Sequence, residues 1–215
     1  MTDAVIQLKI TSLILYFAVS MLYYVRRTFC VGSAISQKLR NNTMDKFEII
    51  KTPDEVNSRI QEMGAEITKD FDSVPLTMIV VMNGGLFFAA KLAEKIKLYD
   101  FYMDSIAAGS YNHDISSGIV ELRSTLKLDP KGRNILIVDE VLDSGRTLKA
   151  IRENLLEKGA LSVKTAVLVE KKLSRPDGIE HADWVGFFMD DRYLIGCGMD
   201  SEEKYRHYPG IAVLK

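Results

Sequence analysis

The segment from residue 134 to residue 150, NILIVDEVLDSGRTLKA, most constrains what this chain can fold into. Its apolar run, residues 135–138, is short and rich in β-branched side chains, as is typical of a buried strand. A helical pattern follows from Leu148 to Lys158, and Gly159 is a helix stop. A strand, a short loop and a helix in this order predict a βα unit of an open α/β sheet.

The loop inside this segment, Asp143–Thr147, has the chemistry of a phosphate site. Backbone N–H groups and the positive end of the helix dipole converge where a helix begins. Ser144 and Thr147 add hydroxyl donors, and Gly145 lets the backbone approach a ligand closely. The loop therefore predicts a cradle for a phosphate dianion, although by itself it is also compatible with an ordinary β-loop-α turn.

Two carboxylates, Asp139 and Glu140, come directly before this loop. They suit sugar hydroxyls or a hydrated divalent cation and would repel a second bare phosphate. A ligand with a phosphate at one end and sugar hydroxyls in the middle fits both features. We therefore expect a 5-phosphoribosyl group to bind here.

The string VDEVLDSGRTL, residues 138–148, closely resembles the phosphoribosyl-pyrophosphate (PRPP) motif of the type I phosphoribosyltransferases. The resemblance extends over residues 44–215 and is to the hypoxanthine-guanine phosphoribosyltransferases. One departure is the order of the acid pair, which is Asp139-Glu140 here but mostly Glu-Asp or Asp-Asp in purine salvage members. Both positions remain acidic, so hydroxyl binding is expected, and the reach of each carboxylate stays open.

Composition sets the class of protein. The chain has 215 residues, enough for one domain with a sizeable core, alone or with an appendage. Its net charge of −1 shows no basic excess that would indicate nucleic-acid binding. The two cysteines, Cys30 and Cys197, have no metal-site spacing and give no reason for a disulfide, which favours the cytoplasm.

Residues 1–43 differ from the rest of the chain. Residues 10–25 contain no charged side chain, but this stretch is shorter than the roughly 20 apolar residues of a membrane span. Arg26 and Arg27 follow it and would place the rest of the chain on the cytoplasmic side if it did span. We therefore expect an N-terminal extension, either a membrane anchor or a segment upstream of the true start at Met44, and a phosphoribosyltransferase domain over residues 44–215.

The first part of this domain, residues 44–75, reads as one helix with a polar lead. Thr52, Pro53 and Glu55 form a helix-start signature. Residues 76–82, LTMIVVM, are typical of a buried strand.

A loop and a helical pattern from Leu86 to Lys95 follow this strand. The resemblance implies that Asn83, Gly84 and Gly85 contact pyrophosphate through their backbone, although many family members have Arg or Lys at the position of Asn83. It also implies a strained or cis peptide bond, which we place at Asn83-Gly84.

A strand from Asp100 to Ala107 precedes a long polar segment, and residues 119–126 are predicted to return as the second arm of a hairpin. The pair Ser110-Tyr111 resembles the catalytic lid of purine salvage enzymes. A lid suits the reaction, because the sugar becomes oxocarbenium-like and water must be excluded. A surface hairpin without a role is the alternative.

The base pocket is predicted on the next strands. A strand over residues 163–169 is followed by Lys171, with Lys172 in reserve, at the edge where open α/β sheets bind ligands. In the family, a lysine here donates to O6 of the purine, which favours 6-oxopurines over adenine. Trp184 and Val185, on a strand predicted at residues 183–188, are expected by resemblance to stack on and line the base.

Near the C-terminus, Asp200 and Arg206 have the residue types and spacing that the family uses for a magnesium ion and for the pyrophosphate. The resemblance implies a mostly parallel sheet flanked by helices, with a small C-terminal hood that residues after Met44 could join. It also implies a homo-dimer or homo-tetramer. The predicted PRPP-binding residues are Asn83, Gly84, Gly85, Asp139, Glu140, Asp143, Ser144, Gly145, Arg146, Thr147 and Arg206.

The implied reaction is Mg²⁺-dependent transfer of the 5-phosphoribosyl group from PRPP to N9 of hypoxanthine or guanine. Asp143 is expected to be the general base or hydrogen-bond acceptor at N7. Two alternatives stay open: an enzyme that prefers xanthine, and a non-catalytic PRPP-sensing regulator with the same fold. The regulator would have lost a catalytic residue or gained a basic face, and neither is visible in the sequence.

Overall fold

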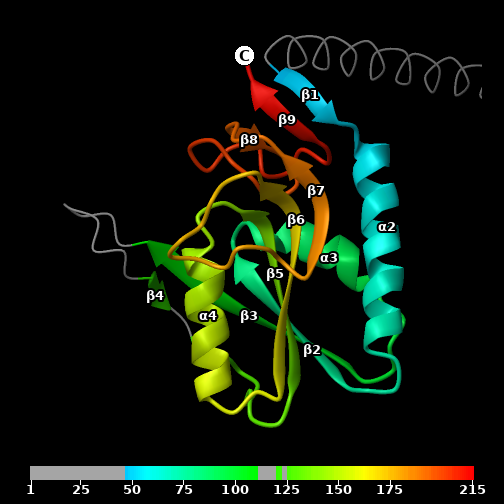
Figure 1. Cartoon of the computed structure of the whole chain (residues 1–215). Coiled ribbons are helices and arrows are strands. Elements are labelled where there is room, and N and C mark those ends of the chain that lie inside the picture. The colour runs from blue at the N-terminus through cyan, green and yellow to red at the C-terminus, as the bar shows by residue number, and fades with distance from the viewer. Residues whose placement is uncertain (1–46, 111–119, 123–124) are drawn as a thin grey trace, which may run out of the picture. The chain divides into compact units, whose positions relative to one another are not determined.

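The fold is described from a computed structural model, which covers residues 47–110, 120–122 and 125–215. Within these residues a six-stranded sheet has the order β4-β3-β2-β5-β6-β7, and all neighbouring pairs are parallel except β3 and β4 (Figure 1). The strands are β2 (Leu76–Met82), β3 (Phe101–Ser110), β4 (Val120–Leu122), β5 (Asn134–Leu142), β6 (Ser162–Lys171) and β7 (Trp184–Met189). The predicted mostly parallel α/β sheet and the hairpin return after β3 are confirmed.

Helices cover both faces of this sheet, and the strand sequences show why. Successive side chains of a strand point to opposite faces. Met78 and Val80 of β2 join the core under α2 (Pro53–Asp70) and α3 (Gly85–Ala93), whereas Ile79 and Val81 join the core under α4 (Arg146–Glu157). Figure 1 shows α4 on one face and α2 with α3 on the other. The strands read as continuous apolar runs because both faces are buried.

Helix α2 begins where the sequence predicts. The Thr52 hydroxyl accepts a hydrogen bond from the backbone N–H of Glu55 at 3.3 Å, and the Glu55 carboxylate accepts one from the backbone N–H of Thr52 at 2.9 Å. This reciprocal capping box satisfies two N–H groups that a helix start leaves unpaired.

A second, three-stranded sheet forms the predicted hood, in the order β1-β9-β8. Its strands are β1 (Phe47–Lys51), β8 (Leu194–Ile195) and β9 (Ile211–Leu214). The prediction that residues after Met44 join the C-terminal segment is confirmed. The prediction that residues 47–51 are a polar lead to the helix is wrong, because this segment is a strand.

Strand register brings the candidate site loops to one edge of the main sheet. Val80 of β2 pairs with Val138 of β5, and Leu142 of β5 pairs with Glu170 of β6. Strand β5 is longer than predicted, since Asp139 pairs with Val167 inside the sheet and the acid pair lies on the strand rather than after it. The loops that follow β2, β5 and β6 therefore leave the same edge, where open α/β sheets bind ligands.

Three predictions concern parts that the structure does not describe. Tyr111 of the predicted lid and residues 10–25 lie outside the described residues, and of Ser110 only the backbone is described, as the last residue of β3. No helix among the described residues is long and apolar enough to cross a membrane. The domain boundary at residues 43 and 44 stays a prediction.

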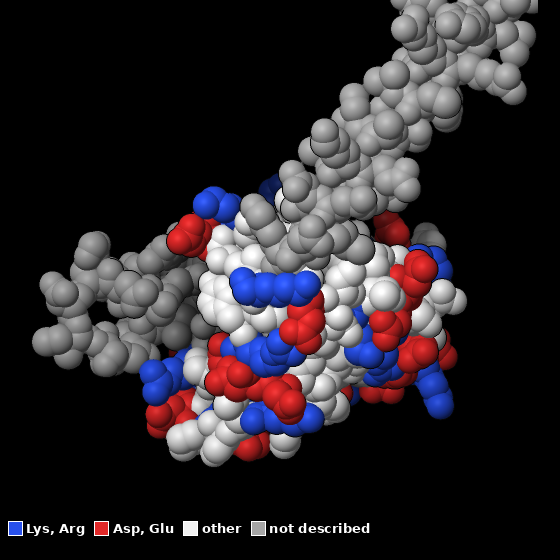
Figure 2. All heavy atoms as spheres, turned by 90° about the horizontal axis from the view of Figure 1, so that it is seen from above, with Lys and Arg blue, Asp and Glu red and all other residues white. Residues whose placement is uncertain are grey.

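Charges of both signs are mixed over the described surface. On the face that Figure 2 shows, Lys and Arg side chains alternate with Asp and Glu side chains, and the described residues of that face form no continuous basic stripe. This mixture matches the net charge of −1.

Candidate active site

The phosphate loop is shaped by Gly145, the residue before α4. Gly145 has φ +73°, in the left-handed region that glycine adopts easily. A Cβ atom there would lie 2.7 Å from the carbonyl oxygen of Ile179 and 2.8 Å from its nitrogen, so a larger residue would push the two segments apart. Among the described residues no side chain caps α4, and the first-turn N–H groups remain for an anion.

The side chain of Arg146 turns away from the helix axis toward the segment that covers the loop. Its guanidinium is 3.1 Å from Asp177, in an ion pair that is mostly exposed. The backbone N–H of Ile179 also donates to the carbonyl of Gly145 at 3.3 Å. The polar connection after β6, residues 173–182, therefore packs directly on the predicted PRPP loop.

The two acids of the pair are adjacent on β5, and their carboxylates interact with each other. Asp139 is buried, and one of its carboxylate oxygens accepts a hydrogen bond from the backbone N–H of Glu140 at 3.0 Å. Burial and then the neighbouring Glu140 carboxylate raise the pKa of Asp139 well above its ordinary value. The Oε2 atom of Glu140 is buried without a hydrogen-bond partner among the described residues. A buried oxygen without a partner can accept a hydrogen bond from a ligand or coordinate a cation.

Glu140 lies against the loop after β2. A Cβ atom on Gly84 would overlap the Glu140 carboxylate, and one on Gly198 would overlap the carbonyl oxygen of Gly84. Glu140, the double-glycine loop (Asn83 to Gly85) and the hood turn (the turn at Gly198 between β8 and β9) are therefore in mutual contact. A cis peptide bond is present in this loop, but at Met82–Asn83, so its predicted position at Asn83-Gly84 is wrong by one bond.

Asp200 and Arg206 form an ion pair in the hood. The Arg206 guanidinium is 2.8 Å from the Asp200 carboxylate and donates to the carbonyl of Gly198 at 2.7 Å. The other Asp200 oxygen accepts from the backbone N–H of Glu203 at 2.8 Å. The two predicted pyrophosphate-side residues are thus close together, on the turn that touches Gly84.

On the other side of the site, Lys171 joins two acids. Its ammonium lies 3.1 Å from the Asp143 carboxylate and 2.9 Å from the Asp191 carboxylate. Burial acts to lower the pKa of Lys171, but the hydrogen bonds to Asp191 and Asp143 outweigh it and the pKa is raised. Lys171, predicted from the sequence, is brought together with Asp143, also predicted. Lys172, the second candidate for this role, is mostly exposed and pairs with Asp190 at 3.0 Å. Lys171 is therefore the lysine that lies beside Asp143.

Trp184 and Val185 are not at this edge, and the prediction that they form the base pocket is wrong. Trp184 is the first residue of β7 and pairs with Ala166, whereas Lys171 pairs with Met189 at the far end of the same strand. The indole packs on Phe71, with ring centroids 6.0 Å apart. Its burial there is core packing.

The first aromatic residue after the end of β7, the end at which Lys171 lies, is Tyr193. It follows Asp191 by two residues and its ring is mostly exposed. Sequence reasoning missed both residues, although they come just after β7 and the rule that selects Lys171 at a strand end applies to them equally. The error arose because the edge at which Trp184 lies depends on how β7 is placed in the sheet.

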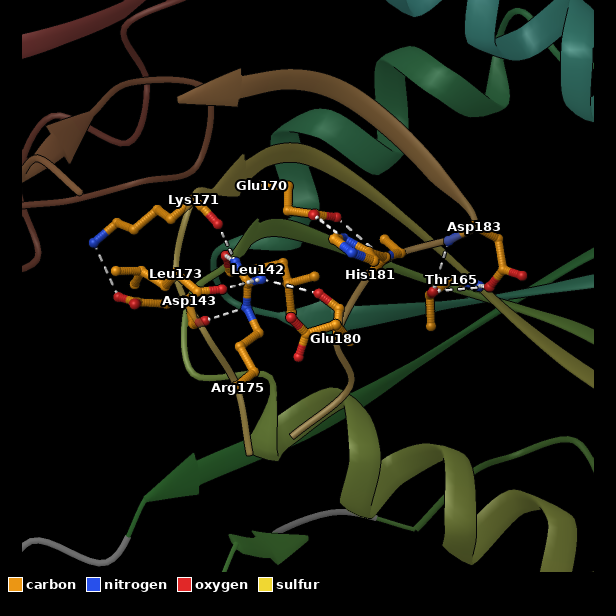
Figure 3. Close-up of polar contacts among 11 residues, drawn as sticks. Leu142, Asp143, Thr165, Glu170, Lys171, Leu173, Arg175, Glu180, His181 and Asp183 are labelled. Carbon is orange, nitrogen blue, oxygen red and sulfur yellow. Dashed lines mark hydrogen bonds and ion pairs between the residues drawn. The ribbon is translucent and has the colours of Figure 1, made fainter. Parts of the chain in front are cut away.

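Arg175 is a further residue that the sequence did not reveal. It is buried, and among the described residues its guanidinium donates only to backbone carbonyls and pairs with no carboxylate. These carbonyls belong to Leu142, Asp143, Lys171, Leu173 and Glu180, and Figure 3 shows them converging on the side chain. One planar fork therefore ties the end of β5, the end of β6 and the covering segment together. No local pattern distinguishes such an arginine from an exposed one.

Two further side chains, Glu170 and Asp183, hold the segment that covers the phosphate loop. Buried Glu170 accepts from the backbone N–H of Ala182 at 3.0 Å and contacts the ring nitrogen Nδ1 of His181 at 2.6 Å (Figure 3). Asp183 accepts from the backbone N–H and the hydroxyl of Thr165, at 2.8 and 2.9 Å. These contacts hold the end of the segment between β6 and β7, and Arg175 holds its start.

Comparison with known proteins identifies the family. The model of the phosphoribosyl transferase domain matches residues 48–202. The chain belongs to this family. The predicted resemblance is confirmed, and the phosphate loop, acid pair and Lys171–Asp143 pair all lie inside the matched phosphoribosyltransferase region.

Relatives of known function agree. The hypoxanthine-guanine phosphoribosyltransferase of Bacillus subtilis is 37% identical over 170 residues, which cover 78% of this chain and 93% of that protein. The bifunctional protein TilS/HprT of Listeria innocua is 32% identical over 194 residues, and the chain spans only 29% of its length. A solved hypoxanthine phosphoribosyltransferase structure from Staphylococcus aureus superposes with a TM-score of 0.75 and 28% identity, over 80% of this chain and 94% of that one.

Proposed function

We propose that this phosphoribosyltransferase serves purine salvage by transferring the 5-phosphoribosyl group of PRPP to N9 of hypoxanthine or guanine, with release of pyrophosphate. The observation that carries the proposal is the Lys171–Asp143 pair, 3.1 Å apart beside the phosphate loop. A 6-oxopurine presents O6 and N7 next to each other on one edge of its rings. A lysine donor and an aspartate acceptor side by side complement that edge. The names of the relatives support the same substrates.

The PRPP end of the site follows from the other contacts. The phosphate loop from Ser144 to Thr147 holds the 5′-phosphate on backbone N–H groups at the start of α4. Asp139 and Glu140 accept from the ribose hydroxyls, and the loop at Gly84 faces the pyrophosphate. Arg206 lies on that side in ion pairs with Asp200 and Glu203, and we assign it the contact to the pyrophosphate. Asp143 accepts the proton or hydrogen bond at N7.

The base pocket proposed here is Lys171, Asp191 and Tyr193. We assign stacking on the purine to Tyr193, whose ring is exposed, in place of the buried Trp184. Adenine would bring its 6-amino group, a donor, against the donor of Lys171, and both would lose a partner. Selection of 6-oxopurines follows from this mismatch.

A magnesium ion belongs to the proposal. No group of three or more potential metal-ligating side chains occurs in the described part of the chain. Mg²⁺ needs none, since it keeps several waters and binds through one or two carboxylates plus substrate phosphates. Asp200 and the unpartnered oxygen of Glu140 fit an ion that arrives with PRPP. Such an ion would neutralise the charge that builds up on the leaving pyrophosphate.

An enzyme that prefers xanthine is the second candidate. The hypoxanthine-guanine-xanthine phosphoribosyltransferase of Tritrichomonas foetus is 33% identical over 175 residues, 80% of this chain. Lys171 and Asp143 contact only the O6 and N7 edge, so they do not choose among bases that differ at C2.

A cytoplasmic homo-dimer or homo-tetramer remains part of the proposal.

The test is a base panel with the full chain. Purified protein, PRPP and Mg²⁺ are combined with hypoxanthine, guanine, xanthine or adenine, and pyrophosphate release is followed. We expect turnover of hypoxanthine and guanine, and loss of about 100-fold in kcat when Asp143 is replaced by Ala. Turnover of xanthine alone would change the substrate and keep the reaction. PRPP binding without turnover of any base would favour the regulator and contradict the proposal.

A further inference from the structure

We infer that Asp191 is a positioning residue that keeps the ammonium of Lys171 aimed at the 6-oxo group of the base while Asp143 engages the neighbouring ring nitrogen. The inference rests on the proposed function and deepens it, because it assigns the preference for 6-oxopurines to a pair of residues rather than to Lys171 alone.

The backbone fixes the position of Asp191. Lys171 is the last residue of β6 and pairs with Met189, the last residue of β7. The next residue along, Lys172, donates its backbone N–H to the carbonyl of Met189 at 2.8 Å, so pairing of the two chains continues past both strand ends. Asp191 comes two residues after Met189 and its carboxylate reaches the Lys171 ammonium at 2.9 Å. It is thus held by the sheet beside the lysine that it contacts.

The hydrogen-bonding capacity of Lys171 explains why a second acid is needed. An ammonium has three N–H donors and no acceptor. Two of the donors point to Asp143 and Asp191, which leaves one for the oxygen of a base. When Asp143 turns to the base, Asp191 is the acid that still neutralises a lysine side chain only 12% exposed. Without Asp191 the ammonium would be desolvated with no anion beside it, which is costly.

The protonation state of Lys171 carries the specificity. A charged ammonium can only donate, so it fits a carbonyl oxygen and rejects an amino group. A neutral amine could also accept, and discrimination against adenine would weaken. The charged groups that face Lys171 are Asp143 from the β5–α4 loop and Asp191 from the β7–β8 connection, with the Arg175 guanidinium on its carbonyl oxygen. Their bonds keep the pKa of Lys171 raised although burial acts to lower it.

The chain offers a matched control in the adjacent residue. Asp190 also pairs with a lysine, Lys172, which directly follows β6, at 3.0 Å, but both side chains are mostly exposed. Asp190→Asn and Asp191→Asn remove the same charge from neighbouring positions of one segment. Only the second removes a contact to the proposed base lysine.

The experiment compares the full chain and these two variants with hypoxanthine, guanine and adenine, across pH. For Asp191→Asn we expect the KM of hypoxanthine and guanine to rise about tenfold, in keeping with the loss of a charge-assisted hydrogen bond, while the KM of PRPP is unchanged. The alkaline limb of kcat/KM for the base should move to lower pH, and the ratio of 6-oxopurine to adenine turnover should fall. Asp190→Asn should match the wild type in all of these, and thermal melts confirm that both variants fold.

Two results would overturn the inference alone. In one, the wild type turns over 6-oxopurines but Asp191→Asn keeps its base KM and its alkaline limb. In the other, Asp191→Asn raises the KM of base and PRPP equally, as a merely structural loss would. A wild type that turns over no base would overturn the proposed function, and this inference with it, so the two failures are distinguishable.

Discussion

The order of the two acids in the PRPP motif has a structural consequence at the level of single residues. Asp139 is buried, and its carboxylate interacts with that of Glu140. The Glu140 carboxylate also lies against Gly84 in the loop after β2. The shorter acid is therefore enclosed at the end of β5, and the longer one spans the gap to the loop that contains Gly84 and Gly85.

The raised pKa of Asp139 predicts a pH dependence of stability. In the unfolded chain this carboxyl has its ordinary pKa of 3.8, and burial followed by the Glu140 charge raises the folded-state pKa well above that value. Between the two pKa values the unfolded state releases a proton that the folded state retains, so the free energy of unfolding falls as pH rises through this window. We expect Asp139→Asn to remove that loss and to raise the melting temperature more at pH 8 than at pH 5.

The measurement is a thermal melt at both pH values. Asp190→Asn is the control, since it removes an exposed carboxylate of the same type and should leave the pH dependence as it is. An Asp139→Asn variant whose melting temperature rises equally at both pH values, or falls at pH 8, would show that Asp139 is not the group that causes the dependence.

At the level of elements, the sequence predicted the features that depend on neighbouring residues. It missed those that depend on contacts between distant parts of the chain. The strand at residues 76–82 and the capped start of α2 follow from the sequence next to them. The segment at residues 47–51 was misjudged because its strand partner, β9, lies at the other end of the chain. Arg175 was missed for a related reason: the carbonyls that it binds are placed by the ends of two strands.

Arg175 gives a prediction for the segment between β6 and β7. Replacing it with Lys keeps the charge but loses the planar five-donor fork, so several buried carbonyls lose their donor. We expect Arg175→Lys to lower the free energy of unfolding by about 3 kcal/mol, measured by urea denaturation. Arg146→Lys is the control, because its ion pair with Asp177 is exposed and should change stability by less than about 0.5 kcal/mol. Equal stabilities of the two variants would refute a clamping role for Arg175.

At the level of the whole molecule, the two halves of the site differ in how far the sequence could predict them. The phosphate loop and acid pair are one continuous string, and their chemistry could be read from residue order. The proposed base pocket uses residues at or just after the ends of β6 and β7. Trp184 could be set aside only once the register of β7 placed it at the opposite end of that strand from Lys171. The contact of the hood through Gly198 could not be predicted from the sequence either, because it joins Gly84 and Gly198, which are far apart along the chain.

That contact allows a last prediction about how the hood and the sheet form one site. Gly198 has φ +105°, and a Cβ atom on it would overlap the carbonyl oxygen of Gly84. Gly198→Ala therefore combines backbone strain with a steric clash against Gly84 of the double-glycine loop. We expect it to lower the free energy of unfolding by about 3 kcal/mol and to raise the KM of PRPP about tenfold.

Gly132→Ala separates the two effects, because Gly132 has φ +73° but no atom within 4 Å of its added Cβ. It should cost only about 1 kcal/mol and leave both substrates unaffected. Urea denaturation and steady-state kinetics with PRPP varied would measure both quantities. If Gly198→Ala behaved like Gly132→Ala, the hood turn would not press on the double-glycine loop, and the two would act independently.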